Sequence, residues 1–155
     1  ESLEAVNWGR NSRLDSLNAR VVLERLSQLD LLINKRRELA NIYYEFLKPL
    51  EDKGLIGLPP MFSTNSKSLS TFQNFEVKVS SREKLTNFLK ENGISTILQW
   101  GGFSIAHFSN LGFNLSEFPQ TEKLFKKILL LPMNHMLTND QVKYISQKIL
   151  TFYNA

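Results

Sequence analysis

A turn close to the start of the chain combines residue types that can hold an anion. Gly9 permits an unusual backbone angle, Asn11 offers an uncharged amide donor, and Arg13 offers a forked cation. A phosphate or carboxylate could bind there, at the N-terminus of the helix that follows. Asp15 would occupy the same positive helix end, so side chains would have to hold the anion. The alternative is a structural turn in which Asn11 caps the backbone and Arg13 pairs with a nearby carboxylate (Asp15 or Glu24), and turn chemistry alone favours it.

A second candidate is the run Gln99-Trp100-Gly101-Gly102-Phe103, which follows an apolar stretch. Two glycines allow close approach of a backbone, and Trp100 could stack on a flat ring. A tight turn whose tryptophan fills the edge of the core fits the same residues equally well.

Other catalytic patterns are missing from the sequence. The two histidines, His107 and His135, are too far apart to form a local metal pair, and no H-E-x-x-H, Walker or G-x-S-x-G motif occurs. The chain has no cysteine, which excludes disulfides and thiolate metal sites. We therefore predict no metal, and spacing alone does not indicate an enzyme.

Composition indicates one globular domain. The 155 residues are 42% hydrophobic and 22% charged, which is enough apolar material for a single core. The net charge of +4 comes from basic residues that stand among acidic ones, so we expect solvated faces and no nucleic-acid partner. The longest apolar run is far too short to cross a bilayer, and we expect a cytoplasmic protein without a membrane partner.

The elements that must position these residues begin with a helical segment. Residues 15–48 contain no glycine or proline and carry apolar residues at steps of three and four, which predicts one long helix or two in tandem. Ser12 or Asp15 is the expected cap, and Pro49 and Gly54 are expected to end the segment.

The rest of the chain alternates strand and helix patterns. Strands are predicted at residues 75–79, 94–99 and 129–131, and helices between them, the second running from Phe118-Pro119 to Ile128. Capping-box spacing at Ser80 and Glu83 and again at Thr138 and Gln141 marks two helix starts, and Asn92-Gly93 marks a helix end. The pattern predicts an α+β fold in which helices cover a small antiparallel or mixed sheet.

An ordered set of short motifs resembles the C-terminal part of the DegT/StrS family of sugar-nucleotide aminotransferases. The resemblance covers nearly the whole chain and rests on the following motifs: Gly9-x-Asn11-x-Arg13-Leu14-Asp15, Arg36-Arg37-x-x-Ala40-x-x-Tyr43, Gly93-Ile94-x-Thr96, Phe118-Pro119-x-Thr121-Glu122, Leu131-Pro132-Met133-Asn134 and Leu137-Thr138.

The resemblance implies a fold-type-I enzyme that depends on pyridoxal 5'-phosphate and moves an amino group, usually from glutamate, to a nucleotide-linked keto sugar for surface polysaccharides or other amino sugars. It also implies a homodimer. Asn11 would reach the cofactor phosphate of the partner subunit, and Arg13 would orient that contact or meet the substrate. Where the family commonly has a Tyr-Pro pair and a histidine beside the sugar nucleotide, this chain has Trp100-Gly101 and, about two residues later than expected, His107.

The same resemblance places the lysine that binds the cofactor as a Schiff base in a large domain upstream of Gly9, so no catalytic residue is expected in this chain. We expect a C-terminal fragment that is inactive alone. Residues 1–34 would form the leading helix and the phosphate-binding turn, residues 35–155 a small α/β sandwich domain, and the N-terminal helix region the dimer contact. The alternative is a free-standing α+β ligand-binding, interaction or dimerisation module without catalysis.

Overall fold

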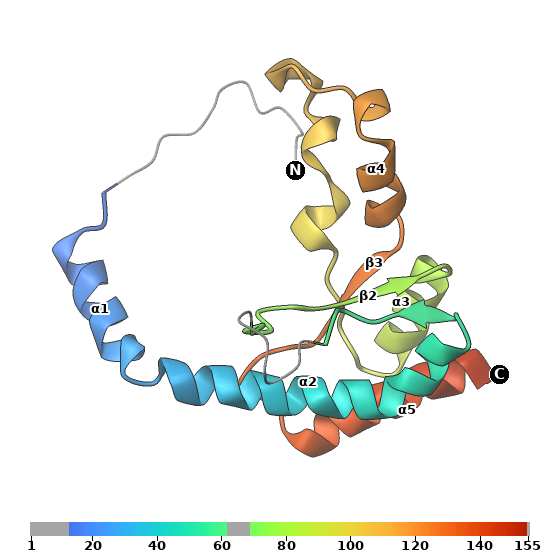
Figure 1. Ribbon diagram of the computed structural model, residues 1–155, viewed down its shortest axis with the longest axis horizontal. Coiled ribbons are helices and arrows are strands. Elements are labelled where there is room, and N and C mark those ends of the chain that lie inside the picture. The colour runs from blue at the N-terminus through green and yellow to red at the C-terminus, as the bar shows by residue number, and fades with distance from the viewer. Residues whose placement is uncertain (1–12, 62–68, 155) are drawn as a thin grey trace.

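The computed structural model describes residues 13–61 and 69–154. The N-terminal helical segment is two helices in tandem, α1 (Ser16–Leu26) and α2 (Leu29–Asp52) (Figure 1). Asp15 caps α1, because its Oδ1 accepts the backbone N–H of Asn18 at 2.8 Å. The predicted cap is thus confirmed, and of the two predicted arrangements the structure has the tandem pair.

Pro49 does not end the helical segment, contrary to prediction. Helix α2 continues through it to Asp52, and the chain leaves the helix at Gly54, whose φ is +70°. Proline removes one backbone donor, but Pro49 and Glu45, whose carbonyl loses that donor, are both exposed, so water can replace the bond. Leu47 and Leu50 on the opposite face are buried and hold this last part of the helix against the core.

The sheet has three antiparallel strands in the order β1-β2-β3: β1 (Ile56–Gly57), β2 (Phe75–Val79) and β3 (Ile128–Leu131). Phe75 pairs with Leu131 and Val77 with Leu129, so these side chains share one face. The structure confirms the α+β class and the strands near 75–79 and 129–131. The two-residue strand β1 has no counterpart in the prediction.

The predicted strand at residues 94–99 is wrong. Ile97 exchanges two backbone hydrogen bonds with Leu130, of 3.2 and 2.9 Å, but this is an isolated bridge. A 3-10 turn, η1 (Gln99–Gly102), begins two residues later, and its backbone is left-handed from Trp100 through Gly102. The ladder stops because the chain turns away before a second pair can form.

Three further helices complete the fold: α3 (Arg82–Glu91), α4 (Pro119–Phe125) and α5 (Asn139–Asn154). Thr138 and Gln141 form the predicted capping box before α5, with bonds of 2.9 and 3.2 Å. The box predicted at Ser80 and Glu83 is wrong, since α3 is preceded by Ser81, whose backbone is not extended and whose side chain makes no capping bond. Helix α4 ends at Phe125 rather than Ile128, because residues 128–131 form β3.

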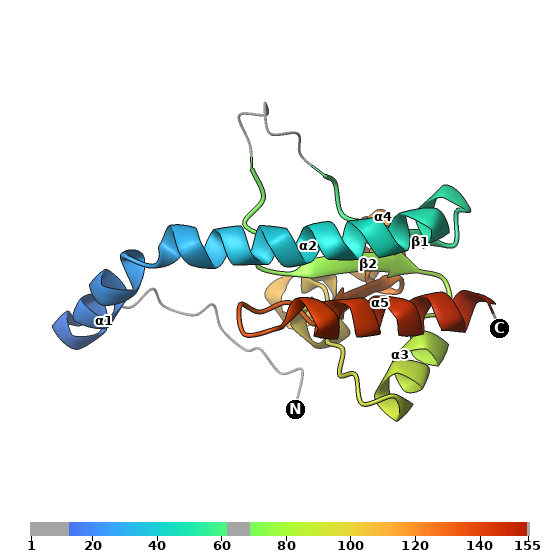
Figure 2. The same cartoon turned by 90° about the horizontal axis from the view of Figure 1, so that it is seen from below.

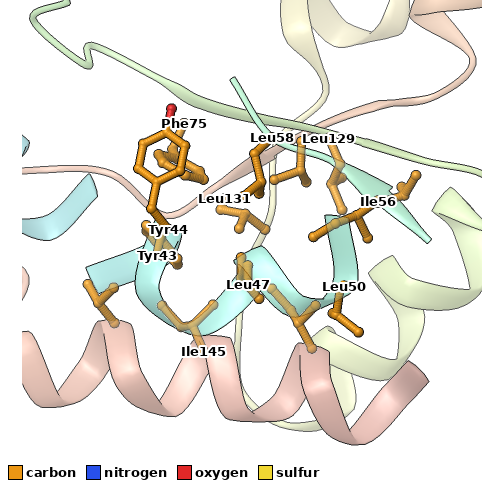
Figure 3. Packing of buried hydrophobic residues seen from close by; sticks show 14 of the residues in the cluster. Tyr43, Tyr44, Leu47, Leu50, Ile56, Leu58, Phe75, Leu129, Leu131 and Ile145 are labelled. Atoms are coloured by element: carbon orange, nitrogen blue, oxygen red, sulfur yellow. The ribbon is translucent and has the colours of Figure 1, made fainter. Parts of the chain in front are cut away.

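The core lies between the sheet and the helices α2, α3 and α5. Helices α2 and α5 pack side by side along one face of the sheet, and α3 packs against α5 (Figure 2). Side chains of α2 and α5 gather with those of the strands in this layer (Figure 3), among them Tyr43, Leu47, Phe75, Leu129 and Ile145. On the other face of β3, Ile128 and Leu130 are also buried, and η1 lies against that strand.

Candidate functional site

Arg13 stands just before α1 and is exposed, and Asn11 lies outside the described residues. The carboxylate partners that a purely structural turn would give Arg13 are engaged elsewhere. Asp15 bonds to Asn18, and these hydrogen bonds, the backbone one first, lower the pKa of Asp15. Glu24 pairs with Arg20 at 3.7 Å. Since Asp15 fills the helix end, an anion bound here must be held by side chains, as the sequence predicts.

Helix α1 exposes an unusual amount of apolar surface. None of its residues is buried, although it carries an apolar stripe, and Leu17 is 77% exposed. An amphipathic helix of this kind is normally covered by another element. The large apolar side chains exposed on and beside α1 are Leu14, Leu17, Val21, Val22, Leu23, Leu26, Leu29 and Leu31.

The Trp100 turn presents its indole ring to solvent. Trp100 has a φ of +47°, which costs a non-glycine residue roughly 1 kcal/mol or more. The side chain does not fill the core edge, because the residue is 73% exposed and only tilts over the Phe125 ring at a centroid distance of 6.1 Å. The ring is therefore free to stack on a planar ligand.

His107 ends the 3-10 turn η2 (Ile105–His107) and belongs to a polar cluster with Ser104 and Glu122. Its Nδ1 lies 3.2 Å from the backbone nitrogen of Ser104 and 3.1 Å from the Ser104 hydroxyl. That hydroxyl donates to Oε1 of Glu122 at 2.5 Å, and Glu122 comes from α4. Sequence reasoning did not single out Ser104 or the role of Glu122; the Ser-x-x-His spacing of a capping box was the available signal.

Trp100 and His107 lie on one segment of the chain, and Arg13 lies apart from it. Both aromatic residues lie on the segment of short 3-10 turns between Ile97 and α4, where Phe103 connects them. The Phe103 N–H donates to the Trp100 carbonyl at 3.3 Å, and its ring meets the His107 ring edge-on at 5.5 Å. Helix α1, which Arg13 precedes, lies away from this segment in both views (Figures 1 and 2).

An apolar groove lies elsewhere in the described residues. It has a volume of about 720 Å³ and lies between β3 and α5, with Ile94, Met133 and Tyr144 in its lining. None of the predicted site residues lines it. In the part of the chain that the structure describes, no group of three His, Cys, Asp or Glu side chains could hold a metal ion, and no helix is long and apolar enough to span a bilayer.

Comparisons with known proteins agree over nearly the whole chain. It is 31% identical over 149 residues to the pleiotropic regulatory protein of Geobacillus stearothermophilus, covering 94% of this chain and 38% of that protein. It is 28% identical over 135 residues to the dTDP-3-amino-3,4,6-trideoxy-alpha-D-glucose transaminase of Micromonospora megalomicea subsp. nigra, covering 85% and 35%. The chain thus spans less than half the length of these relatives.

Solved structures of aminotransferases have the same fold as this chain. A crystal structure of a DegT DnrJ EryC1 StrS aminotransferase from Brucella abortus superposes with a TM-score of 0.74 at 24% identity, covering all of this chain and 40% of that one. The sequence model of the DegT/DnrJ/EryC1/StrS aminotransferase family matches residues 1–150. With nearly every residue inside that match, the chain belongs to the DegT/DnrJ/EryC1/StrS aminotransferase family.

Proposed function

We propose that this chain is the C-terminal part of a pyridoxal-phosphate-dependent aminotransferase. The complete enzyme transfers an amino group from glutamate to the keto group of a nucleotide-linked deoxysugar, in the synthesis of surface polysaccharides or other amino sugars. The observation that carries this proposal is the family match over residues 1–150 in a chain that covers less than half of its relatives. A cytoplasmic location is part of the proposal and rests on the family resemblance alone.

The cofactor would be held between subunits. When bound, pyridoxal phosphate acts as an electron sink for reactions at the carbon that carries the amino group. Asn11 of this chain would donate its amide to the cofactor phosphate in the partner subunit, and Arg13 would orient that contact or bind the substrate. Because Asp15 already accepts the Asn18 N–H at the start of α1, side chains rather than the helix end would have to hold the phosphate.

The exposed stripe of α1 supports a homodimer formed through the N-terminal helix region. In such a dimer the stripe would lie against the rest of the protein or the partner subunit, and the turn before it would reach the partner's cofactor. We assign residues 1–34 to this leading segment and residues 35–155 to a small sandwich domain. Every residue of the main buried cluster lies in the second part, which supports the division.

The sugar nucleotide would meet Trp100 and His107. An exposed indole suits stacking on the base or sugar, and an imidazole donor suits an oxygen of the substrate. The relative from Micromonospora, named for a dTDP-linked amino sugar, supports this substrate class. The remainder of the protein would supply three catalytic residues: the lysine that binds the cofactor covalently, the residue that pairs with its pyridine nitrogen, and the aromatic residue that stacks on its pyridine ring.

Cofactor binding tests the proposal. The complete protein should show the visible absorption band of bound pyridoxal phosphate, whereas the 155-residue chain loaded in the same way should show none. The complete protein should also transfer an amino group from glutamate to nucleotide-linked keto sugars, and the 155-residue chain should not. An equal band from the chain alone would contradict this assignment, and a complete protein that binds no cofactor would favour a ligand-binding or interaction module.

A further inference from the structure

Arg36 on α2 is a cation without a partner among the described residues. Its Nε atom is buried and makes no hydrogen bond, and its guanidinium forms no other hydrogen bond or ion pair with that part of the chain. The neighbouring cations are both engaged. Lys35 Nζ donates to Asn139 Oδ1 at 2.9 Å. Arg37 Nε donates to the Ser70 carbonyl at 3.0 Å. Since an arginine does not lose its proton in proteins, Arg36 carries an unpaired charge.

This charge lies in line with the hydrophobic core. Arg36 continues the buried stripe of α2, in which the following residues come at steps of four and three: Ala40, Tyr43, Leu47 and Leu50. An apolar side chain at Arg36 would extend that stripe by another turn. The sequence instead has a half-buried cation whose Nε is closed to water. A buried donor of a charged group that lacks a partner is costly, so a partner from outside the described residues is expected.

Arg36 lies where the rest of the chain stops covering α2. Asn139, the first residue of α5, contacts Lys35 and Glu38 on either side of this position. The earlier turns of α2 extend beyond α5 and the sheet (Figure 2). They leave Leu31 70% exposed and continue the exposed apolar stripe of α1. A protein surface that covers these turns would therefore reach the guanidinium.

We propose that Arg36 forms an ion pair with a carboxylate in the part of the protein outside this chain, in the region that covers α1 and the first turns of α2. The pair rests on the function proposed above in one respect: the 155 residues belong to a longer enzyme. They cover 38% of the Geobacillus relative, so enough chain lies outside them to form that cover. A carboxylate has two acceptors that match the forked donors of a guanidinium. Arg36 does not line the groove between β3 and α5, so that groove offers it no small-molecule anion.

Arg36→Met tests the pair, because it removes the charge and keeps a long side chain of similar helix propensity. In the 155-residue chain this variant should leave the melting temperature equal or raise it, since an unpaired charge is removed from the edge of the core. In the complete protein without ligands it should lower the melting temperature by about 3 °C or more, because a covered carboxylate loses its partner. The two measurements should thus differ in sign.

Arg37→Met is the matched control on the same helix. The partner of Arg37 is the Ser70 carbonyl inside this chain, so the variant should lower the melting temperature of both the chain and the complete protein. Circular dichroism checks that each variant is folded. If Arg36→Met lowered the melting temperature of the 155-residue chain as much as Arg37→Met does, its partner would lie inside the chain and the proposal would be overturned. An unchanged melting temperature of the complete protein would overturn it too.

The complete protein also identifies the anion. Its crystal structure should show a carboxylate oxygen within about 4 Å of the Arg36 guanidinium. A loss of stability that appears only with added pyridoxal phosphate or dTDP would show that Arg36 binds a phosphate, and it would overturn the carboxylate partner. Failure of the proposed function looks different: a complete protein without aminotransferase activity would contradict that function, and the comparison of melting temperatures would stand.

Discussion

The hydroxyl of Tyr43 donates a 2.8 Å hydrogen bond to the carbonyl of Pro132, 89 residues further along the chain. Tyr43 is fully buried on α2, and burial raises the pKa of its hydroxyl well above the ordinary value. Pro132 directly follows β3, where the chain leaves the sheet toward α5. The bond therefore links α2 to the segment that joins β3 to α5.

Tyr43→Phe should lower the free energy of unfolding by about 1 to 2 kcal/mol, because the Pro132 carbonyl loses its partner in a partly buried place. Urea unfolding of the chain measures this. Tyr144→Phe is the matched control: its hydroxyl bonds to the Asn92 carbonyl at 3.1 Å, but the residue is 44% exposed and water can replace the bond. Equal losses in the two variants would contradict the role given to Tyr43.

Glu38 makes the contact between α2 and α5 sensitive to acid. Its Oε1 accepts from the Asn139 amide at 2.6 Å, and the hydrogen bonds from Asn139 and then Lys35 lower its pKa from the ordinary 4.5. A carboxyl with a lowered pKa in the folded state stabilises the fold above its unfolded pKa, and the stabilisation is lost as the pH falls through the folded value.

We expect wild type and Glu38→Gln to differ in urea midpoint at neutral pH and to converge as the pH falls below the ordinary pKa of 4.5 and through the lowered pKa of the folded state. The measurement is the midpoint at several pH values. Glu45→Gln, on the exposed face of the same helix, is the control and should follow wild type throughout. A constant difference between wild type and Glu38→Gln at all pH values would contradict this reasoning.

Substitution on the exposed stripe of α1 should affect assembly and leave the chain's own stability unchanged. Leu17→Gln removes a side chain that contacts no core, so the unfolding free energy of the 155-residue chain should change by less than about 0.5 kcal/mol. In the complete protein, sedimentation should show a shift from dimer to monomer. Arg25→Gln introduces the same residue on the same helix and should leave the dimer intact. An unchanged dimer in Leu17→Gln would exclude this surface from the contact.

Trp100→Gly should separate stability from substrate binding. Glycine relieves the left-handed backbone, so the melting temperature of the chain should stay equal or rise. Loss of aromatic stacking, about 1 to 3 kcal/mol, should raise KM for the nucleotide sugar about tenfold or more in the complete enzyme. Trp100→Phe keeps an aromatic ring, so its KM should fall between those of wild type and Trp100→Gly. A wild-type KM in Trp100→Gly would remove Trp100 from the substrate site.

Asn11→Ala should weaken cofactor retention in the complete dimer by about 1 to 3 kcal/mol, the contribution of one hydrogen bond to a charged group. Equilibrium dialysis against pyridoxal phosphate gives the change in Kd. Asn7→Ala, four residues earlier, is the matched control and should bind as wild type does. Equal retention in both variants would show that Asn11 does not contact the phosphate.

Most of the fold followed from local patterns. The two tandem helices, the strand of Phe75 to Val79 and the box of Thr138 and Gln141 are each specified by periodicity or capping chemistry within a few residues. The α+β class and the family resemblance could be predicted for the same reason, because they rest on local patterns. At Pro49 the error came from tertiary packing, because buried leucines hold the helix. At Ile97 it came from the left-handed turn that ends the ladder.

The sequence by itself determined the types of residue at the proposed site: Asn11 and Arg13 in a polar turn, Trp100 beside two glycines, and His107 with no second histidine nearby. Only the tertiary structure decided that Trp100 faces solvent and that Glu122, 15 residues beyond His107, reaches Ser104. The physical reason is that periodicity and capping act within one element. Hydrogen bonds between elements depend on where packing places each helix, and no spacing in the sequence records that.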